Sequence, residues 1–290
     1  MVWLIGCNGM LGKETAELLT KENIDFSGTD REIDITDASA LDEFAAKLVK
    51  DGKPLSYIIN CAAYTNVDKA ETDTELCHAL NAAGPGNIAR VANKYGARLI
   101  HISTDYVFDG KANSPYKENA TANPTGVYGK TKYEGEKAIQ ALFQNYYIIR
   151  TAWLYGKHGK NFVFTMLKFM KEQKPLKVVN DQYGTPTYAA DLAKVLVFFV
   201  KKTGIPFGTY HFTNLGETNW FEFAQQIQRL GLKYNQLEKE SPLASCSTQE
   251  YPTPASRPAY SVLDKSKISS VLDRPIPQWQ RSLETFIKGL

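Results

Sequence analysis

The stretch Val2-Trp-Leu-Ile-Gly-Cys-Asn-Gly-Met-Leu-Gly12 decides the fold. Its first four residues are apolar and predict a buried strand, and a segment with helical periodicity follows at Met10–Lys21. Three glycines with the spacing G-x-x-G-x-x-G occupy the turn between them. Glycine allows a sharp turn and lets a pyrophosphate approach the N–H groups at the helix N-terminus, where the helix dipole favours anions. The stretch therefore predicts a dinucleotide-binding turn.

The alternation of short apolar runs with helical segments continues through the first half of the chain. Further strands are predicted at Asp25–Thr29, Tyr57–Asn60, Leu99–Ser103 and Tyr147–Thr151. Helices are predicted at Met10–Lys21, Ala38–Lys50, Tyr128–Phe143 and Thr72–Tyr95, the last broken near Gly84-Pro85-Gly86. Buried strands that alternate with helices indicate an α/β fold with a doubly wound, Rossmann-like parallel sheet.

The second half has a looser pattern. Helices are predicted at Phe162–Gln173, Ala189–Lys202, Trp220–Leu230 and Gln280–Ile287, and short strands near Leu176–Val179 and Thr209–Phe212. The four prolines within Pro242–Pro258 predict an extended loop. We expect an NAD(P)-binding domain at residues 1–151 and a smaller, loop-rich substrate lobe at residues 152–290, from which some segments return to the first domain.

Composition excludes several classes of protein. The 290 residues carry 34 basic and 31 acidic side chains, a formal charge of +3, so no nucleic-acid footprint is present. The longest apolar run, Val195–Val200, is far shorter than the roughly 20 residues that span a bilayer. The N-terminal residues lack the pattern of a signal peptide, and four scattered cysteines and four histidines predict neither disulfides nor a zinc site. We expect a cytoplasmic enzyme with no membrane or nucleic-acid partner.

Two residues after the second predicted strand bear on the choice of cofactor. Asp30 is placed to accept hydrogen bonds from the adenosine ribose of NAD(H). Arg31 is placed to pair with the 2′-phosphate of NADP(H). The sequence therefore leaves NADH and NADPH both open. Asp34 and Ile35 suit either an adenine pocket or a turn carboxylate followed by a core isoleucine.

A tyrosine and a lysine four residues apart are the candidate acid–base pair. Tyr128 and Lys132 share one face of a predicted helix, and Ser103-Thr104-Asp105 ends the strand before it. An ammonium beside a phenol stabilises the phenolate and lowers its pKa, and the Thr104 hydroxyl can bind the same carbonyl oxygen. Tyr133 and Lys137 repeat the spacing but point roughly 140° away, so we expect that pair to be a surface feature.

Longer motifs carry a resemblance to a known family. They are Asn60-Cys-Ala-Ala-Tyr-Thr-Asn-Val-Asp-Lys-Ala-Glu71, Ser103-Thr-Asp-Tyr-Val-Phe-Asp-Gly110, Val127-Tyr-Gly-Lys-Thr-Lys132, Arg150-Thr-Ala-Trp153, Val179-Asn-Asp-Gln-Tyr-Gly-Thr-Pro-Thr187 and Tyr251-Pro-Thr-Pro-Ala-Ser-Arg-Pro258. With the glycine turn, they resemble the extended short-chain dehydrogenase/reductases and, within them, the dTDP-4-dehydrorhamnose reductase branch. The resemblance extends nearly from end to end. It implies NAD(P)H-dependent reduction of the 4-keto group of dTDP-4-dehydro-L-rhamnose.

The resemblance also implies a role for individual residues. Tyr128 would be the proton donor, with Lys132 as its partner and Thr104 as a contact of the carbonyl oxygen. The cofactor would lie against Gly6, Asn8, Gly9, Met10, Leu11, Gly12, Asp30, Arg31, Asp34, Ile35, Ala62, Ala63, Tyr64, Ser103, Tyr128 and Lys132. The nucleotide-sugar would lie against Thr104, Asp105, Tyr128, Trp153, Asp181, Gln182 and Arg257. Trp153 is also compatible with a core position, and Arg257 with an exposed loop.

Some family members bind Mg²⁺ through glutamates at a dimer interface. Glu14 is available here, but Phe286–Leu290 offers no carboxylate side chain, so no metal site is predicted and a monomer and a homodimer both stay open. One alternative function is that of another 4-ketoreductase, or of an epimerase or 4,6-dehydratase of the same fold. By the resemblance, the dehydratases have Thr-Asp-Glu at the position where this chain has Thr104-Asp105-Tyr106. A second rival is a non-catalytic regulatory subunit, against which the retained Tyr128 and Lys132 argue.

Overall fold

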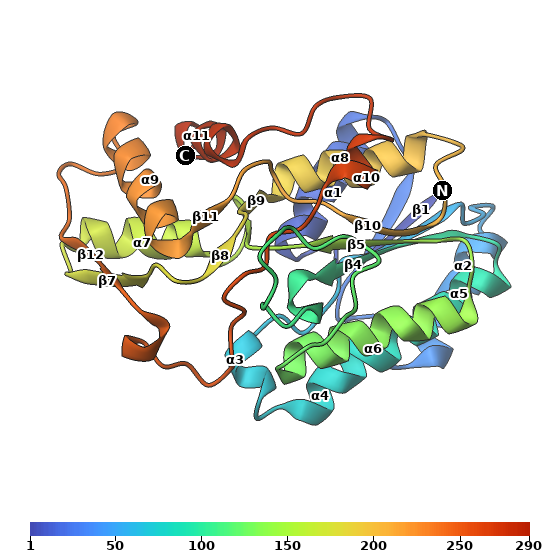
Figure 1. The fold of residues 1–290 in the computed structure, drawn as a ribbon. Coiled ribbons are helices and arrows are strands. Elements are labelled where there is room, and N and C mark those ends of the chain that lie inside the picture. The colour runs from blue at the N-terminus through green and yellow to red at the C-terminus, as the bar shows by residue number, and fades with distance from the viewer.

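A six-stranded sheet forms the centre of the molecule (Figure 1). The structure is a computed structural model and describes all residues, 1–290. In spatial order the strands are β10 (Gly208–His211), β5 (Tyr146–Thr151), β4 (Arg98–Thr104), β3 (Tyr57–Asn60), β1 (Val2–Ile5) and β2 (Phe26–Thr29). Every neighbouring pair is parallel. The strand order reverses direction beside β1, so the predicted doubly wound sheet is confirmed.

Helices cover both faces of this sheet (Figure 1). One face carries α1 (Met10–Lys21), α8 (Ala189–Lys201) and α10 (Ser266–Ser269), and the other carries α2 (Ala38–Lys50), α5 (Gly84–Lys94) and α6 (Val127–Leu142). The alternation of side chains along β1 explains why all four of its residues are apolar. Val2 and Leu4 pack into the core below α1 and α8, whereas Trp3 and Ile5 pack into the core against α2 and α5.

The break predicted near Gly84-Pro85-Gly86, within the helix expected at Thr72–Tyr95, is wrong. After the short α3 (Val67–Ala70), the chain forms α4 (Thr74–His78), a π-helical turn at Ala79–Ala83 and α5 without leaving helical backbone angles. Pro85 is tolerated because it occupies the first turn of α5, where its missing N–H removes no α-helical bond. The irregular π turn accommodates α6, since a Cβ at Gly135 would lie 2.1 Å from the carbonyl oxygen of Asn81.

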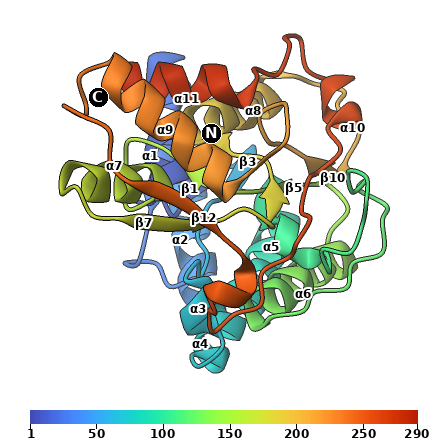
Figure 2. The same ribbon diagram turned by 60° about the vertical axis from the view of Figure 1, so that its left-hand side comes forward.

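A second, smaller lobe lies beside the carboxyl edge of the sheet (Figure 2). Its elements are β6 (Leu154–Tyr155), α7 (Phe162–Lys171), β7 (Leu176–Val179), β8 (Tyr183–Gly184), β9 (Thr187–Tyr188), β11 (Thr218–Asn219), α9 (Trp220–Lys233), β12 (Leu243–Cys246) and α11 (Trp279–Lys288). The strands form two-stranded pairs, β6 with β9, β7 with β12 and β8 with β11. A separate core of fifteen buried residues joins α7, α9 and α11.

Segments from the second half of the chain return to the first lobe. The strand predicted at Thr209–Phe212 is β10, which extends the central sheet by pairing with β5. Helix α8 packs against α1, and Leu192 and Leu196 join the same core as Val2 and Leu4. The central sheet is thus completed by residues more than 50 positions after its fifth strand.

The prediction of one extended loop at Pro242–Pro258 is wrong at its beginning. Leu243–Cys246 forms β12, which pairs in parallel with β7, and a 3₁₀ turn follows at Thr248–Glu250. The prolines lie outside the paired segment, so they remove none of its ladder hydrogen bonds. A second 3₁₀ turn, Asp105–Val107, directly follows β4.

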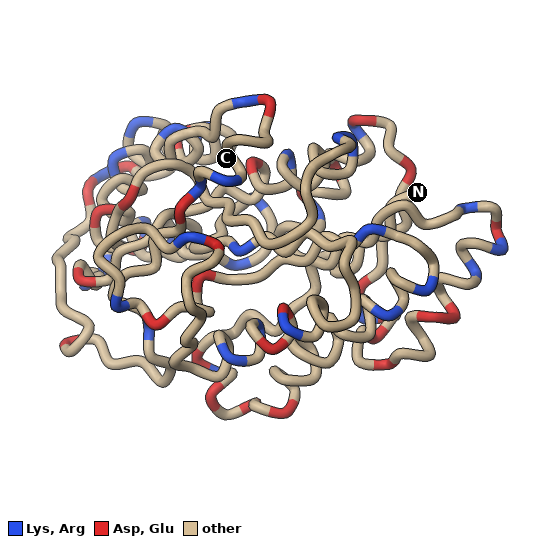
Figure 3. The backbone as a smooth tube through the Cα atoms, turned by 45° about the vertical axis from the view of Figure 1, so that its right-hand side comes forward, with Lys and Arg blue, Asp and Glu red and all other residues tan.

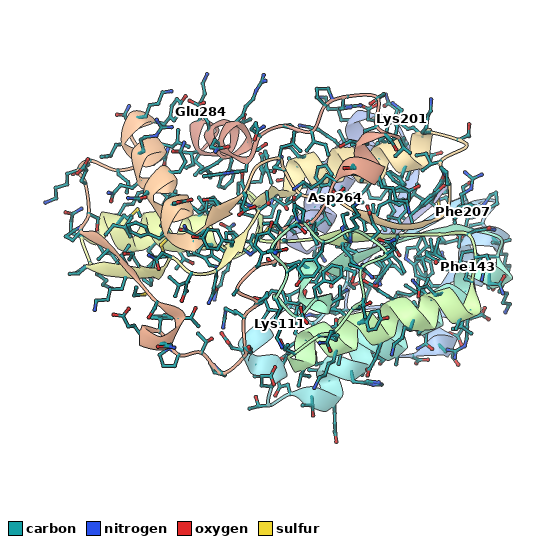
Figure 4. The ribbon with its side chains drawn as sticks, viewed as in Figure 1. Lys111, Phe143, Lys201, Phe207, Asp264 and Glu284 are labelled. Atoms are coloured by element: carbon teal, nitrogen blue, oxygen red, sulfur yellow. The ribbon has the colours of Figure 1, made fainter.

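Charges of both signs are spread over the whole chain (Figure 3). Many form exposed ion pairs between helices, for example Lys201 of α8 with Glu22 and Glu284 of α11 with Lys233, both at 2.6 Å between nitrogen and oxygen. Figure 4 places Lys201 and Glu284 at the outer surface of the two lobes. No helix reaches the combination of length and apolar character needed to cross a bilayer.

Candidate active site

The glycine turn connects β1 to α1 at the point where the strand order reverses. Gly6 has a φ of 77°, and a Cβ there would lie 2.7 Å from the backbone nitrogen of Ala62. A Cβ at Gly12 would lie 2.0 Å from the Gly6 carbonyl oxygen. Neither position can therefore carry a side chain without moving backbone. Glycine is required at both ends because the turn is compact.

The N-terminus of α1 is open to an anion. Gly9 precedes the helix, and no side chain caps its first N–H groups. Asn8 and Gly9 are exposed, whereas Leu11 packs into the core with 5% of its surface exposed. A cradle that excludes side chains below an uncapped helix N-terminus fits the pyrophosphate of a dinucleotide.

The residues after β2 form the far wall of this cradle. Asp30 Oδ2 accepts a hydrogen bond from the backbone N–H of Asn8 at 3.1 Å. Glu32 Oε1 accepts from the N–H of Asp30 at 2.8 Å, and Arg31 is exposed. Asp30 thus lies beside the glycine turn, as a residue that contacts an adenosine ribose must. Glu32 was missed from sequence, although an acidic residue two positions after Asp30 is visible there.

Asp34 and Ile35 lie in a turn after Asp30, and their contact with the adenine of a cofactor stays a prediction. Asp34 Oδ1 accepts hydrogen bonds from the backbone N–H and the hydroxyl of Thr36, both at 2.8 Å. Ile35 is 4% exposed and packs against Gly84 at the start of α5. The pair is a turn carboxylate followed by a core isoleucine.

The segment after β3 forms the floor next to the glycine turn. Ala62 donates its backbone N–H to Asn60 Oδ1 at 3.0 Å, and Ala62 and Ala63 are partly buried. Tyr64 is held by Asn81, whose side chain bonds both backbone groups of Tyr64, and its phenol donates to Asp73 at 2.9 Å. These small side chains leave room above the floor, while Tyr64 is fixed at its margin.

Thr104 ends β4 at the carboxyl edge of the sheet, and Asp105 begins the 3₁₀ turn that follows. Both are at least 96% buried, and the Thr104 hydroxyl donates to Asp105 Oδ1 at 3.0 Å. Asp105 Oδ2 has no hydrogen-bond partner in the protein. Burial raises the pKa of Asp105 to about 6, against the lowering effect of the neighbouring Ser261 and Thr104 hydroxyls. Thr104 therefore lies beside a buried carboxyl that is near the Ser261 hydroxyl and whose Oδ2 is shielded from solvent.

Tyr128 lies in the first turn of α6, opposite Thr104. Burial raises the pKa of its phenol, and a hydrogen bond with Thr104 lowers it less. Its ring meets the ring of Tyr106 edge to face, with 5.5 Å between centroids. The expected lowering of the phenol pKa by Lys132 is not found, because burial has the largest effect on Tyr128 and Lys132 is not among the groups that shift its pKa. At neutral pH the phenol keeps its proton and can donate it.

Lys132 lies one helical turn further along α6 and is 2% exposed. Its Nζ donates to the carbonyl oxygen of Ile102 at 2.6 Å and lies 3.4 Å from His101 Nε2. Burial lowers the pKa of Lys132 to about 8, although the Glu136 carboxylate opposes this. The second pair with this spacing, Tyr133 and Lys137, is not buried in this way. The Lys137 side chain is exposed, with its Nζ 5.0 Å from the centroid of the Tyr133 ring.

The Ser103 hydroxyl is bonded away from Thr104, Tyr128 and Lys132. The hydroxyl donates to Glu136 Oε1 at 2.5 Å, and Glu136 forms a bidentate ion pair with Arg150 at 2.9 and 2.7 Å. The Ser103 hydroxyl proton is thus engaged by Glu136, and contact of Ser103 with a cofactor stays a prediction.

Trp153 follows β5 and packs against the core of the second lobe. Its φ is 47°, and its ring stacks on Trp220 with 3.6 Å between centroids and 13° between planes. A Cβ at Gly184 would lie 2.6 Å from the Trp153 ring. Trp153 is partly exposed, so it combines a packed position with a free apolar edge. Trp220, at the start of α9, was missed because nothing in the sequence links it to Trp153.

The three remaining substrate candidates are tied to other residues. Asp181 accepts from the hydroxyl and N–H of Thr248 at 2.7 and 2.8 Å, and Gln182 donates to the same hydroxyl at 3.0 Å. Arg257 forms a bidentate ion pair with Asp68 of α3 at 3.0 and 2.8 Å. Asp68 belongs to the Asn60–Glu71 motif, but sequence reasoning gave it no role.

The structure does not support a Mg²⁺ site. No three His, Cys, Asp or Glu side chains lie close enough together to hold a metal ion. Glu14 is 6% exposed, and its nearest cation is Lys157 at 3.9 Å. Burial raises the pKa of Glu14, which favours a neutral carboxyl over a metal ligand.

Known proteins match the chain over its whole length. The family model described as RmlD substrate binding domain matches residues 1–290. A curated protein of Aggregatibacter actinomycetemcomitans, named dTDP-4-dehydrorhamnose reductase, is 37% identical over 97% of this chain and 96% of its own. A solved structure of a dTDP-4-dehydrorhamnose reductase from Clostridium acetobutylicum is 41% identical, with a TM-score of 0.90 over 99% of this chain and 98% of that one. The same enzyme from Bacillus anthracis, solved in complex with NADP, is 38% identical, with a TM-score of 0.90 over 100% and 99% of the two chains.

Proposed function

Because the chain belongs to the family described as RmlD substrate binding domain, we propose that it reduces the 4-keto group of dTDP-4-dehydro-L-rhamnose to give dTDP-L-rhamnose. NADPH or NADH is the reductant. One observation carries the proposal beyond resemblance: the Tyr128 ring packs edge to face on Tyr106, two residues after Thr104, which brings the phenol toward the Thr104 hydroxyl at the carboxyl edge of the sheet. Ligands of open α/β sheets bind at this edge.

The cofactor, when bound, supplies the hydride for C4 of the sugar. Negative charge then develops on the 4-oxygen, and catalysis comes from donors that are fixed around that oxygen. Tyr128 gives its proton to this oxygen. Thr104 would hold the oxygen once its hydroxyl, which donates to Asp105 Oδ1 in this structure, turns to the sugar. Burial supports these roles, since it keeps the phenol protonated at neutral pH and excludes competing water.

Lys132 supports the same proton transfer without contacting the sugar. Its Ile102 hydrogen bond fixes Nζ at the end of β4, one helical turn from Tyr128. An ammonium there stabilises the phenolate that remains after the proton has left, and the family resemblance gives it a second role as a ligand of the nicotinamide ribose.

The residues that would hold the dinucleotide come from three loops. The glycine turn and the N-terminus of α1 would bind the pyrophosphate, Ala62, Ala63 and Tyr64 would line the floor, and Asp30 and Arg31 would meet the adenosine ribose. Asp30 favours NADH, and the exposed Arg31 can turn to a 2′-phosphate. We propose that both cofactors are used.

The sugar nucleotide would lie between the lobes. The partly exposed Trp153 would meet the deoxysugar, and Asp105, whose buried Oδ2 has no hydrogen-bond partner, would accept from a sugar hydroxyl that reaches it. Arg257 would meet the diphosphate with the N–H groups that its Asp68 pair leaves free, and Asp181 and Gln182 would lie near the nucleotide.

Other activities of this fold meet specific obstacles. A 4,6-dehydratase must move a proton from C5, and the position that follows Asp105 holds Tyr106 instead of a glutamate. A regulatory subunit would need neither the Thr104–Tyr128 pair nor a buried lysine beside it. Four free cysteines suit a reducing, cytoplasmic compartment.

Stoichiometry of cofactor use tests the proposal. Purified protein is mixed with a limiting amount of dTDP-4-dehydro-L-rhamnose and excess NADPH or NADH, and absorbance loss and dTDP-L-rhamnose are measured together. We expect one cofactor oxidised for each product formed. An epimerase or dehydratase would change the sugar without net oxidation of NADPH, and a regulatory subunit would change neither.

A further inference from the structure

A chain of buried polar side chains runs behind Lys132, from β3 through β4 to α6. Asn60 and His101 are register partners on β3 and β4, with 1% and 0% of their surfaces exposed. Asn60 Nδ2 lies 3.1 Å from His101 Nδ1. His101 Nε2 lies 3.4 Å from Lys132 Nζ. The reaction described above uses only the last of these three residues.

The orientation of the Asn60 amide follows from its other neighbour. Ala62 donates its backbone N–H to Asn60 Oδ1 at 3.0 Å. A backbone N–H can only donate, so the amide oxygen must face Ala62 and the amide nitrogen must face His101. An amide nitrogen can also only donate. His101 Nδ1 is therefore the acceptor and carries no proton.

The protonation of His101 at Nε2 follows. Burial, with a smaller effect of Lys132, holds the pKa of His101 well below its usual value, so the ring is neutral. A neutral imidazole with a bare Nδ1 carries its proton on Nε2, which points at Lys132. A lysine amine can accept that N–H through its lone pair, whereas an ammonium has no lone pair and meets it donor to donor.

We propose that His101, with its tautomer set by Asn60, is a positioning residue that shifts Lys132 toward its neutral amine, so that Lys132 titrates within the working pH range of the enzyme. This inference rests on the proposed function, because Lys132 is the lysine of that reaction. Its consequence is an alkaline limit: each reduction consumes a proton, and the ammonium that supports the phenolate is lost as the pH rises through the pKa of Lys132.

The other groups that face Lys132 have the opposite effect. Glu136 on α6, Cys77 on α4 and Cys61 after β3 each raise its pKa, and only burial lowers it. Tyr128, one turn earlier on α6, is neutral at these pH values. The Nε2–H of His101 is thus the one directed contact that disfavours the ammonium.

The chain contains a matched control in its second fully buried histidine. His211 Nδ1 lies 3.1 Å from the carbonyl oxygen of Tyr116, and its Nε2 lies 3.4 Å from Arg150 Nη1. A carbonyl only accepts, so His211 must carry its proton on Nδ1. Burial lowers its pKa to about 3, and the ring is neutral. The two buried histidines should therefore be opposite tautomers.

The first measurement is the ¹⁵N spectrum of histidine-labelled protein, in which protonated and bare ring nitrogens have different shifts. We expect His101 to be protonated on Nε2 and His211 on Nδ1. Asn60→Asp replaces the amide by a carboxylate that accepts from both neighbours, so His101 should switch to Nδ1–H while His211 stays unchanged. His101→Gln removes its two ring-nitrogen resonances and so assigns them.

The second measurement follows Lys132 itself in ¹³C-lysine-labelled protein, with Lys132→Met as the assignment control, together with the alkaline limb of kcat. Asn60→Asp and His101→Gln should each move both titrations up by about one pH unit, because each presents an oxygen or a bare nitrogen to the ammonium. His101→Gln introduces no charge, so it separates the acceptor from the charge that Asn60→Asp adds.

A wild-type His101 protonated on Nδ1, or a Lys132 titration that neither variant moves, would overturn the inference. The ¹⁵N and ¹³C spectra need no substrate. If they agree with the expectation while the protein fails to reduce the keto-sugar, the proposed function is wrong and the tuning of Lys132 stands.

Discussion

Asp68 and Arg257, which are 189 residues apart in sequence, join the two lobes by two parallel charge-assisted hydrogen bonds of 3.0 and 2.8 Å. Figures 1 and 2 show the segment after β12 passing along α3, where Asp68 lies. Asp68 Oδ1 also accepts the backbone N–H of Ala255 at 3.2 Å. The Asp68 carboxylate therefore fixes both the guanidinium and the loop that carries it.

Loss of this contact should weaken nucleotide-sugar binding. Asp68→Asn removes the negative partner and leaves Arg257 mobile, so we expect KM for the nucleotide-sugar to rise on the order of tenfold with kcat little changed. Steady-state kinetics at saturating NADPH measures both constants. Asp273→Asn breaks the exposed Asp273–Arg274 pair and should have no effect. An unchanged KM in Asp68→Asn would contradict the role of Arg257 at the diphosphate.

Tyr128→Phe should keep cofactor binding and lose most of the turnover. The phenol proton is needed only in the chemical step, so kcat should fall on the order of 10²–10⁴-fold while the Kd for NADPH stays near the wild-type value. Rapid-mixing kinetics and fluorescence titration measure the two quantities. Tyr133→Phe, the matched control on the other side of α6, should be nearly silent. A Tyr128→Phe enzyme with wild-type kcat would remove Tyr128 from the mechanism.

Asp30 and Arg31 should divide the preference for the two cofactors. Both cofactors are expected to work, with kcat/KM values within about tenfold, or about 1.4 kcal/mol. Arg31→Ala should raise KM for NADPH and leave NADH almost unchanged, because it removes the partner of the 2′-phosphate. Asp30→Ala should do the reverse. Equal effects of Arg31→Ala on both cofactors would mean that the residue does not contact the phosphate.

Sugar binding should depend on pH through Asp105. Its pKa is raised to about 6 by burial, so the carboxylate that accepts from a sugar hydroxyl is present above pH 6 and is lost as the pH falls below it. We expect KM for the nucleotide-sugar to rise as the pH falls from 7 to 5, with an apparent pKa near 6. Asp105→Asn should abolish this dependence. A wild-type KM that is flat over this range would show that the free oxygen of Asp105 does not bind the sugar.

Local patterns predicted the elements around the glycine turn well. The bounds of β1, α1 and α2 are those expected, because a strand buried on both faces and helices with clear ends leave a strong signal in a few residues. The strand at residues 208–211 was expected as a short strand of the less regular half. Its place in the central sheet depends on pairing with β5 across more than 50 residues, which no local pattern records.

The same limit applies to the site. Tyr128 and Lys132 could be predicted because their spacing and their position after β4 are both visible in sequence. Three partners of site residues could not be predicted: Asp68, which binds Arg257, Trp220, which stacks on Trp153, and His101, which lies beside Lys132. Each partner belongs to a different segment of the chain, and only the fold brings it near. Ser103 is the opposite case. Its position in the sequence suits the site, but its hydroxyl donates to Glu136.

The most direct test of the central claim follows the hydride. NADPH carrying deuterium at C4 of the nicotinamide ring is incubated with dTDP-4-dehydro-L-rhamnose, in separate reactions for the two C4 positions, and the product is analysed by mass spectrometry and NMR. The account predicts one deuterium at C4 of dTDP-L-rhamnose for each NADPH oxidised, from one of the two faces only. A product without deuterium at C4, or a changed sugar with NADPH left intact, would contradict it.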